Sequence, residues 1–145
     1  MKLSTRTRYG IRAMVELAGN FGQGPLQIKA IGSSQEISVK YLEQLMTILK
    51  SGGFIRSIRG ARGGYILARP PEQIRLDEIF IALEGSISPA ECIEEGGNCA
   101  RAADCVTRVL WLEVQKAMIA VLQSYTLKDL AEKVKNRHDK LDYAI

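Results

Sequence analysis

The sequence predicts a mainly α-helical fold that carries one small β-hairpin. Apolar residues recur with helical spacing along most of the 145 residues, which is the main sequence signal of amphipathic helices. Two short β-rich runs flank a glycine-rich segment, which is the pattern of a hairpin. The chain is 46% hydrophobic and 25% charged, as in globular proteins with a buried core. At this length we expect one domain, or a small domain with an appended oligomerisation element.

Three helices are predicted in the first fifty residues. Their apolar residues recur every three or four positions, and glycines or polar turns separate one helix from the next. Ser38 stands at the start of the third helix, where its hydroxyl can accept a hydrogen bond from a free backbone amide. The predicted helices span about 6–20, 26–33 and 39–50.

A β-hairpin is predicted after the third helix. The β-rich runs 54–59 and 65–68 are separated by Gly-Ala-Arg-Gly-Gly, which favours a flexible, basic tip. Helix, helix, turn, helix and hairpin is the order of a winged helix-turn-helix, in which one helix enters the major groove of DNA. The alternative is a winged helix that serves only protein contacts.

Charge divides the chain at Pro70-Pro71. Residues 1–70 contain eleven basic and three acidic residues, a net charge of +8, whereas residues 71–145 have a net charge of −4. The first segment is therefore the candidate for binding a polyanion, and arginines at the hairpin tip argue against a wing that contacts only protein. The plainer alternative is that basic residues merely keep the domain in solution.

Three further helices are predicted in the second segment, at about 76–83, 105–124 and 127–135. The helix at 105–124 is apolar over more than one stripe, which is more than packing against one neighbour requires. We therefore expect a homodimer through this helix, the alternative being a buried helix of a monomer. Thr126 can cap the last helix, and the polar tail is expected to fray.

These elements divide the chain into two parts. Residues 1–70 are predicted to form a winged helix-turn-helix DNA-binding domain. Residues 71–145 contain a cysteine loop (about 85–105), the dimerisation helix (about 105–124) and the C-terminal helix.

The three cysteines of the chain lie within fourteen residues, at Cys92, Cys99 and Cys105. Gly96 and Gly97 allow the loop to fold back, so that three sulfurs can converge on a thiophilic metal or an iron–sulfur cluster. A zinc site, redox-sensing thiols and clustering by chance are the alternatives. The sole histidine, His138, lies in the polar tail and is interpreted as a solvated residue.

Several classes of protein are excluded. An odd number of cysteines argues against a secreted disulfide scaffold, and the N-terminus lacks the apolar core of a signal peptide. No apolar run approaches the roughly 20 residues of a membrane span, so we expect a cytoplasmic protein. The sequence has no CxxC pair, no histidine near a cysteine and no phosphate-binding glycine loop, so an enzyme is not expected. An iron–sulfur electron carrier would bring four protein ligands and no basic winged helix.

Three segments resemble the IscR-type transcription regulators of the Rrf superfamily, which also contains NsrR-type nitric oxide sensors and CymR-type cysteine-metabolism regulators. The segments are MKLSTRTRYGIRAMVELA, VKYLEQLMTILKSGGFIRSIRGARGGYILARPPEQIRLDEI and CIEEGGNCARAADCVTRVLW. The resemblance implies a homodimeric repressor or activator that binds a double-stranded DNA operator. It also implies a long crossing dimerisation helix and, in many members, a [2Fe-2S] cluster that tunes DNA binding.

The resemblance makes the third helix the recognition helix. Arg59 matches the family arginine that enters the groove, and Lys40 replaces a serine that helps the IscR type to read bases, so site preference is expected to differ. Glu43 can accept a hydrogen bond from a cytosine amino group, while Arg56 and Arg62 suit phosphate contacts. The candidate DNA-binding residues are Ser38, Lys40, Tyr41, Glu43, Gln44, Arg56, Arg59 and Arg62.

The resemblance also assigns the three cysteines as cluster ligands, although Cys92 and Cys99 enclose one residue more than in some members. Where other members have a fourth ligand, histidine or aspartate, this chain has Arg108 or Arg8. A guanidinium group has no lone pair to offer, so neither arginine can be that ligand. The fourth ligand is unknown, with a small exogenous molecule or a carboxylate as alternatives: Glu91, Glu94, Glu95 or Asp104. Such a site predicts a labile cluster, which suits a sensor.

Two functions follow. The first is a homodimeric DNA-binding regulator that senses iron–sulfur or redox status through a [2Fe-2S] cluster. The second is a cluster-independent regulator of cysteine or sulfur metabolism, controlled by thiol oxidation or by a protein partner.

Overall fold

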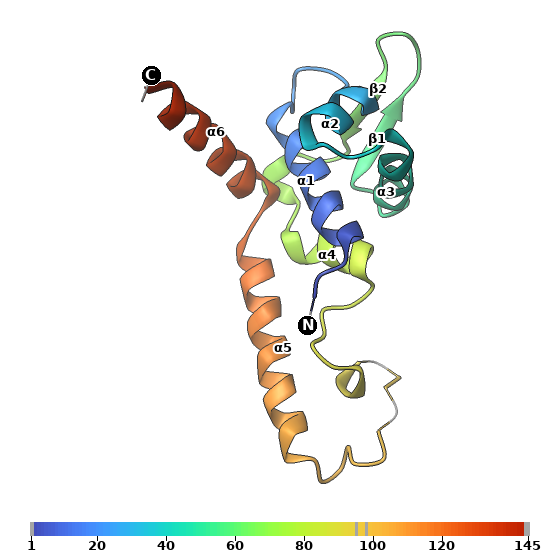
Figure 1. Cartoon of the computed structure of the whole chain (residues 1–145), viewed down its shortest axis with the longest axis vertical. Helices are drawn as coiled ribbons and strands as arrows, with labels where there is room; N and C mark the ends of the chain where they lie inside the picture. The colour runs from blue at the N-terminus through green and yellow to red at the C-terminus, as the bar shows by residue number, and fades with distance from the viewer. Residues whose placement is uncertain (1, 95, 98, 144–145) are drawn as a thin grey trace.

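The computed structural model describes residues 2–94, 96–97 and 99–143, and it is mostly helical with one two-stranded antiparallel hairpin (Figure 1). The predicted fold class is confirmed. In chain order the elements are α1 (Thr5–Gly19), α2 (Ile28–Gln35), α3 (Val39–Ser51), β1 (Ile55–Ile58), β2 (Gly64–Leu67), η1 (Pro71–Gln73), α4 (Leu76–Glu84), η2 (Glu91–Ile93), α5 (Val106–Ser124) and α6 (Leu127–Tyr143).

Side-chain caps fix the starts of α1 and α3. The Ser4 hydroxyl accepts a hydrogen bond from the Thr7 amide at 3.1 Å, and Ser38 accepts one from the Tyr41 amide at 3.2 Å. Each bond satisfies one of the amides that a helix leaves free at its first turn. The predicted cap at Ser38 is therefore confirmed.

The second helix begins two residues later than predicted. Leu26 is withdrawn from it because its backbone pairs with Tyr65 of β2, with N–O distances of 3.0 and 2.9 Å. The helix then continues to Gln35 and ends at Glu36, whose φ of 56° places it in the left-handed region. Leu26 thus lies beside β2 and forms a single antiparallel bridge with Tyr65, outside the two-stranded hairpin.

The hairpin pairs β1 with β2 in the register Ile55 to Leu67 and Ile58 to Gly64. Gly63 is required at the tip, because a Cβ atom there would lie 2.0 Å from the Ile58 carbonyl oxygen. The hairpin projects from the body of the winged helix as the predicted wing.

One hydrophobic core joins both segments of the chain. Burying each of its aliphatic side chains contributes about 1.5–3 kcal/mol. Phe21, which follows the first helix, is exposed. Fully buried members include Met14, Ile31, Leu42, Leu45, Met46, Leu49, Ile55, Ile74, Ile79, Leu83 and Leu127.

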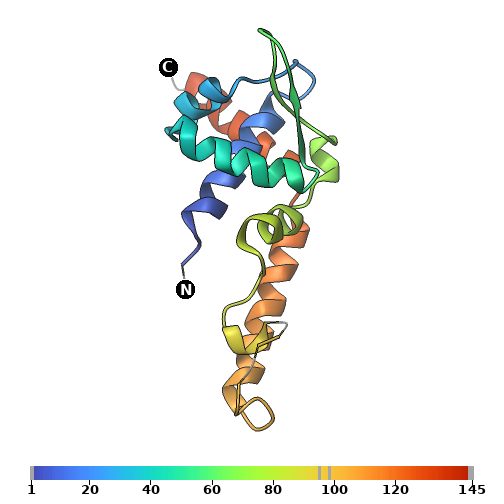
Figure 2. The ribbon, with the colours of Figure 1, turned by 90° about the vertical axis from the view of Figure 1, so that its right-hand side faces the viewer.

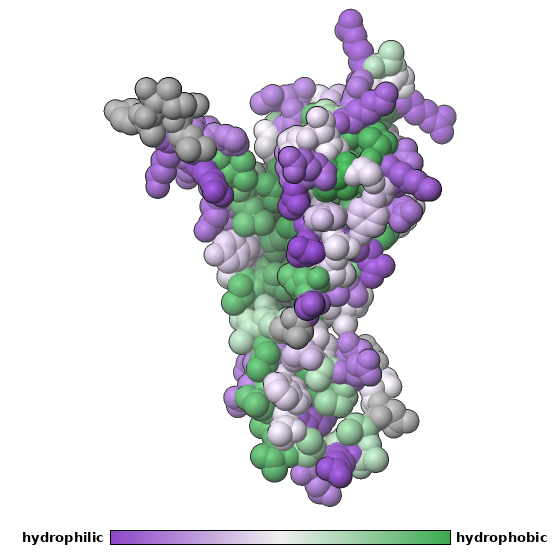
Figure 3. Space-filling view, viewed as in Figure 1, coloured by the Kyte–Doolittle hydropathy of each residue, from purple (hydrophilic) through white to green (hydrophobic). Residues whose placement is uncertain are grey.

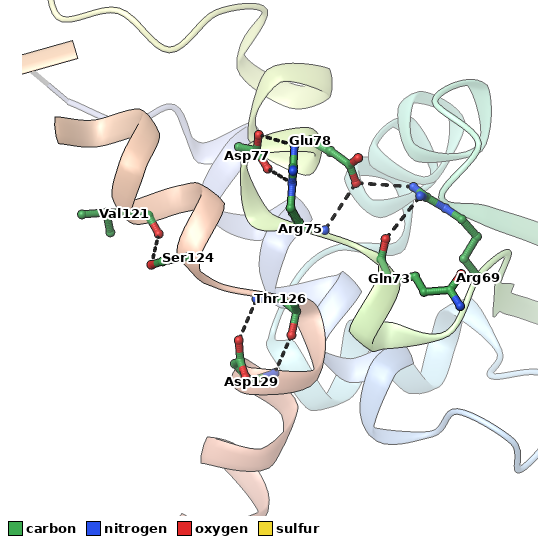
Figure 4. Close-up of polar contacts among 9 residues, drawn as sticks. All are labelled: Arg69, Gln73, Arg75, Asp77, Glu78, Val121, Ser124, Thr126 and Asp129. Carbon is green, nitrogen blue, oxygen red and sulfur yellow. Dashed lines mark hydrogen bonds and ion pairs between the residues drawn. The ribbon is translucent and has the colours of Figure 1, made fainter. Parts of the chain in front are cut away.

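The bend between α5 and α6 is held against the start of α4 (Figure 4). The Leu76 amide donates to the Tyr125 carbonyl at 3.0 Å, and the Leu127 amide donates to the Ile74 carbonyl at 2.8 Å. Thr126 and Asp129 cap α6 reciprocally, with amide-to-side-chain distances of 2.8 and 3.3 Å. The predicted cap at Thr126 is confirmed.

The last helix is longer than predicted. It runs to Tyr143 rather than ending near residue 135, so the expectation of a frayed tail is wrong for residues 136–143, while residues 144–145 of that tail lie outside the described part of the chain. The tail contains neither glycine nor proline, and each added residue continues the helical hydrogen bonding once the helix has begun. The first turns of α6 pack against α1, and its remainder projects from the body (Figure 1).

The long helix α5 extends away from the winged helix, and the cysteine loop lies beside its N-terminal half (Figures 1 and 2). In both views the loop and the wing are at opposite ends of the molecule. No helix in the described part of the chain combines the length and the hydropathy that crossing a bilayer requires.

Candidate nucleic-acid interface and cysteine loop

The recognition-helix candidate α3 has one buried and one exposed face. Four apolar side chains anchor it in the core: Leu42, Leu45, Met46 and Leu49. Lys40, Glu43 and Gln44 are exposed on its other side, together with Thr47. Positions three and four apart on a helix lie side by side, so these side chains form one polar row. The predicted interface residues of α3 that can reach a ligand are therefore presented together.

Two other predicted interface residues hold α3 in place. Ser38 caps it, and the Tyr41 hydroxyl lies 3.3 Å from the Thr5 hydroxyl of α1. The Tyr41 ring is half-buried and meets the Tyr9 ring edge to face, with centroids 6.1 Å apart. Tyr41 thus connects the first turn of α3 to α1.

The wing adds exposed cations next to this row. Arg56 lies on β1, Arg59 and Arg62 lie in the tip, and all three are exposed. Lys50 at the end of α3 donates to the Ser57 hydroxyl at 3.0 Å, which ties the helix to the wing. Residues 39–67 contain five basic residues and one acidic residue. Hydrophilic side chains extend from the wing in the space-filling view (Figure 3), as a surface that binds phosphate would require.

Two arginines of α1 lie beside the same surface and were not predicted to belong to it. The guanidinium carbons of Arg8 and Arg12 lie 5.7 and 5.3 Å from the centre of the Tyr9 ring, within cation–π range. Arg12 also donates to the Gln35 side chain at 3.0 Å, which fixes the end of α2. The spacing of these arginines, one helical turn apart and flanking a tyrosine, is the sequence signal that could have identified them.

The three cysteines are free thiols at separate points of the loop. Cys92 lies in η2, Cys99 in the following turn, and Cys105 at the N-cap of α5, and each is half-buried. A Cβ atom at Gly97 would lie 2.3 Å from the Glu91 carbonyl oxygen. The loop therefore folds closely over the backbone around Cys92.

Cys105 occupies a setting that favours its thiolate. Its sulfur lies 3.1 Å from the Thr107 hydroxyl. The hydrogen bond from Thr107, followed by that from the Arg108 amide, holds the pKa of the Cys105 thiol below its usual range. Thiolates are the form of cysteine that binds metals and reacts with oxidants.

The donor set fits an iron–sulfur cluster in chemistry but is incomplete. Within residues 2–94, 96–97 and 99–143, no three His, Cys, Asp or Glu side chains come together as ligands for one metal ion. Of the candidate fourth ligands, Glu91 and Asp104 are exposed, and Glu94 accepts a hydrogen bond from Ser86 at 3.1 Å. Glu95 lies outside the described residues.

The two positions where the resemblance leads one to look for a fourth ligand hold cations. Arg8 is exposed on α1. The Nε atom of Arg108 is buried and has no hydrogen-bond partner in the described part of the chain. A buried guanidinium nitrogen three residues after Cys105 favours an anion nearby, such as thiolate sulfur, and not a metal ion.

An apolar surface covers much of α5. None of its residues is fully buried, and Val106, Val109 and Val121 are 84%, 60% and 58% exposed. Leu110, Trp111 and Leu112 are also exposed on this helix. Hydrophobic side chains gather along α5 in the space-filling view (Figure 3). Contiguous apolar patches of this kind mark sites of protein association.

Comparisons with known proteins agree with this geometry. Residues 3–133 match the family model Rrf2, described as an iron-dependent transcriptional regulator. Protein rrf2 of Nitratidesulfovibrio vulgaris is 46% identical over 90% of this chain and 87% of its own. The HTH-type transcriptional regulator CymR of Bacillus subtilis is 43% identical over 90% of both chains.

Solved structures of two such proteins share the fold. The structure of CymR, the global cysteine regulator of B. subtilis, matches with a TM-score of 0.78 and 42% identity, covering 92% of this chain and 98% of that one. The structure of T. potens IscR matches with a TM-score of 0.76 and 37% identity, covering 92% and 88% of the two chains.

Proposed function

The chain belongs to the Rrf2 family of transcriptional regulators, and we propose that it is a cytoplasmic homodimer whose affinity for an operator depends on a [2Fe-2S] cluster. It is a regulator and not an enzyme, since its relatives are named as transcriptional regulators. The observation that carries the proposal is the combination, in one chain, of an exposed polar row on α3 beside a basic wing with three free thiols on one loop.

In this proposal residues 1–70 bind the operator, and α3 lies in the major groove. Gln44 can pair with adenine, Glu43 can accept from cytosine and Lys40 can donate to guanine, so the row can read base edges. Arg59 enters the groove from the wing, while Arg56 and Arg62 contact phosphates. Ser38 and Tyr41 contribute by holding the helix, since both are engaged within the protein.

The apolar surface of α5 is covered by the same surface of a second copy in this proposal. Two-fold symmetry then repeats α3 and the wing on the other half of the operator. Half-sites about 34–36 Å apart, or a small multiple of that distance, follow from the pitch of DNA.

Residues 71–145 hold the sensing part in this proposal. Cys92, Cys99 and Cys105 bind the cluster through their thiolates, and the fourth position is filled by a carboxylate or a small molecule. When bound, the cluster supplies a centre that can change oxidation state and exchange its fourth ligand. Cys105 begins α5, so ordering of the loop acts directly on the proposed dimerisation helix.

A cluster-independent regulator of cysteine or sulfur metabolism is the second candidate. It is favoured by the cations Arg8 and Arg108 at the positions expected for a fourth ligand, and by the likeness to CymR, the cysteine regulator. In that case the three free thiols respond to oxidation, or a protein partner controls DNA binding.

Anaerobic purification separates the two candidates. We expect a coloured protein with visible absorbance, two iron atoms and two sulfides per chain, all lost in Cys92→Ser. Asp104→Asn lies in the same loop and leaves the three thiols intact. Comparing it with Cys92→Ser tests whether the Asp104 carboxylate is the fourth ligand of the cluster. A colourless, iron-free protein that also fails to take up iron and sulfide would contradict the cluster and leave the thiol-based regulator.

A further inference from the structure

The last turn of α4 is fastened to the first turn of α1 by hydrogen bonds. The Glu84 carboxylate accepts one from Ser4, at 2.7 Å, and one from Thr7. Next to it, Nε of Arg6 donates to the Leu83 carbonyl at 2.7 Å. The bonds from Thr7 and then Ser4 hold the pKa of Glu84 below its usual range, so the acceptor is a carboxylate at neutral pH.

The two helices also pack closely, because the Leu83 side chain of α4 lies directly on the backbone of α1 at Gly10. Gly10 of α1 is buried, and a Cβ atom there would lie 2.6 Å from Cδ1 of Leu83. Thr7 is fully buried at the same contact. Closely packed interiors transmit a displacement more than they absorb it. A shift of the end of α4 therefore moves the first turn of α1.

The same turn of α1 contacts the recognition helix on another side. The Thr5 hydroxyl lies 3.3 Å from the Tyr41 hydroxyl, and Tyr9 packs edge to face on the Tyr41 ring. Tyr41 lies in the first turn of α3, next to Lys40 and close to Glu43. Glu84 immediately precedes Gly85, where the loop that carries the cysteines begins. One helical turn thus joins the base of this loop to the row proposed to read DNA.

We propose that Glu84, Thr7 and Tyr41 are positioning residues that connect the state of the cysteine loop to the placement of the recognition helix through the first turn of α1. This inference rests on the proposed function, since it names the route by which the proposed sensing loop controls DNA binding. None of the three residues needs to touch the cluster, and Tyr41 acts by fixing where Lys40, Glu43 and Gln44 lie.

The test compares Thr7→Val, which removes the hydroxyl at nearly constant shape, with Thr7→Ser, which keeps it. Glu84→Gln and Tyr41→Phe extend the test to the two ends of the route. The probe is a duplex selected from a randomised library by the wild-type, cluster-loaded dimer. Affinity for it is measured anaerobically with the cluster and after its removal, and visible absorbance confirms loading of every variant.

Allosteric coupling typically changes affinity about 5–150-fold. We expect the ratio of the two wild-type affinities, measured with the cluster and after its removal, to fall in this range. Thr7→Val, Glu84→Gln and Tyr41→Phe should bring the ratio to within about twofold of one, while Thr7→Ser keeps the wild-type value. Hydrogen exchange of the α3 amides should respond to cluster removal in the wild type and in Thr7→Ser, but not in Thr7→Val.

The outcomes separate this inference from the proposed function. A wild-type ratio that survives in Thr7→Val and Glu84→Gln, with intact cluster absorbance, overturns the route and leaves the sensing function standing. Equal loss of coupling in Thr7→Ser and Thr7→Val also overturns it, because the hydroxyl would then be irrelevant. A wild-type ratio of one overturns the sensing function together with the route.

Discussion

The backbone amide of Leu127 donates to the carbonyl of Ile74 at 2.8 Å, and both side chains are fully buried. This bond joins the start of α6 to the segment that leads into α4. Together with the neighbouring bond from Leu76 to Tyr125, it fixes the bend between α5 and α6 to the core of the winged helix. The direction in which α5 leaves the winged helix is therefore set by backbone hydrogen bonds.

The buried side chain at this joint should dominate its stability. Leu127→Ala leaves a cavity in the core, and such substitutions lower the free energy of unfolding by about 2–5 kcal/mol. Val134→Ala, on the exposed part of the same helix, should change it by no more than about 0.5 kcal/mol. Urea denaturation monitored by circular dichroism measures both. Equal effects of the two substitutions would contradict the placement of Leu127 in the core.

The cap of α6 should make stability depend on pH. The backbone amide of Thr126, and after it the Thr126 hydroxyl, bind the Asp129 carboxylate and lower its pKa. A carboxyl whose pKa is lower in the folded state contributes stability above its unfolded pKa of about 4 and loses it as pH falls through the folded value. Wild type should therefore exceed Asp129→Asn in stability at pH 7, by a margin that shrinks below about pH 4.

Urea denaturation at pH 7, 4 and 3 gives this margin directly. Asp139→Asn, at an exposed position farther along α6, is the matched control and should show no such convergence with the wild type. A margin for Asp129→Asn that stays constant over this range would show that the carboxylate does not cap the helix.

The apolar surface of α5 should control the oligomeric state. Leu110→Glu places a charge in the proposed interface, so the variant should elute as a 16.0 kDa monomer where the wild type elutes as a dimer. Light scattering after size exclusion measures the mass. Val134→Glu, an exposed apolar position on α6, should remain dimeric. A wild-type monomer, or a dimer that tolerates Leu110→Glu, would contradict association through α5.

The wing arginines should differ in what they recognise. Arg59→Ala should weaken binding to a selected operator by about 1–3 kcal/mol and weaken binding to random DNA far less. Arg56→Ala should weaken both nearly equally and lower the salt dependence of binding, as loss of a phosphate contact does. Fluorescence anisotropy titrations at two salt concentrations provide these values. Equal losses on both duplexes for Arg59→Ala would remove its role in reading bases.

The sequence predicted a helix correctly where residues within or next to that helix determine its position. The start of α3 was predictable because Ser38 supplies a cap, and α5 was predictable because apolar residues recur with helical spacing from Val106 to Leu122. The start of α2 was not, since Leu26 is engaged by Tyr65, far away in the sequence.

The candidate site likewise has features that the sequence predicted and features that depend on how the helices pack. The resemblance and the charge distribution pointed to α3, the wing and the three cysteines, and Lys40 and Arg59 are exposed in the structure. The engagement of Tyr41 by Thr5, and of Glu84 by Thr7, depends on how helices pack. No spacing along the chain encodes such contacts, so only the structure could bring them out.

The proposed sensing function is tested most sharply by the affinity of the anaerobic dimer for its selected operator, measured before and after removal of the cluster from the same preparation. We expect the wild-type affinity to change at least about fivefold. The same treatment should leave the affinity of Cys99→Ser unchanged, because this variant should purify without the cluster. Equal affinities of the cluster-loaded and cluster-free wild type would contradict the sensing function.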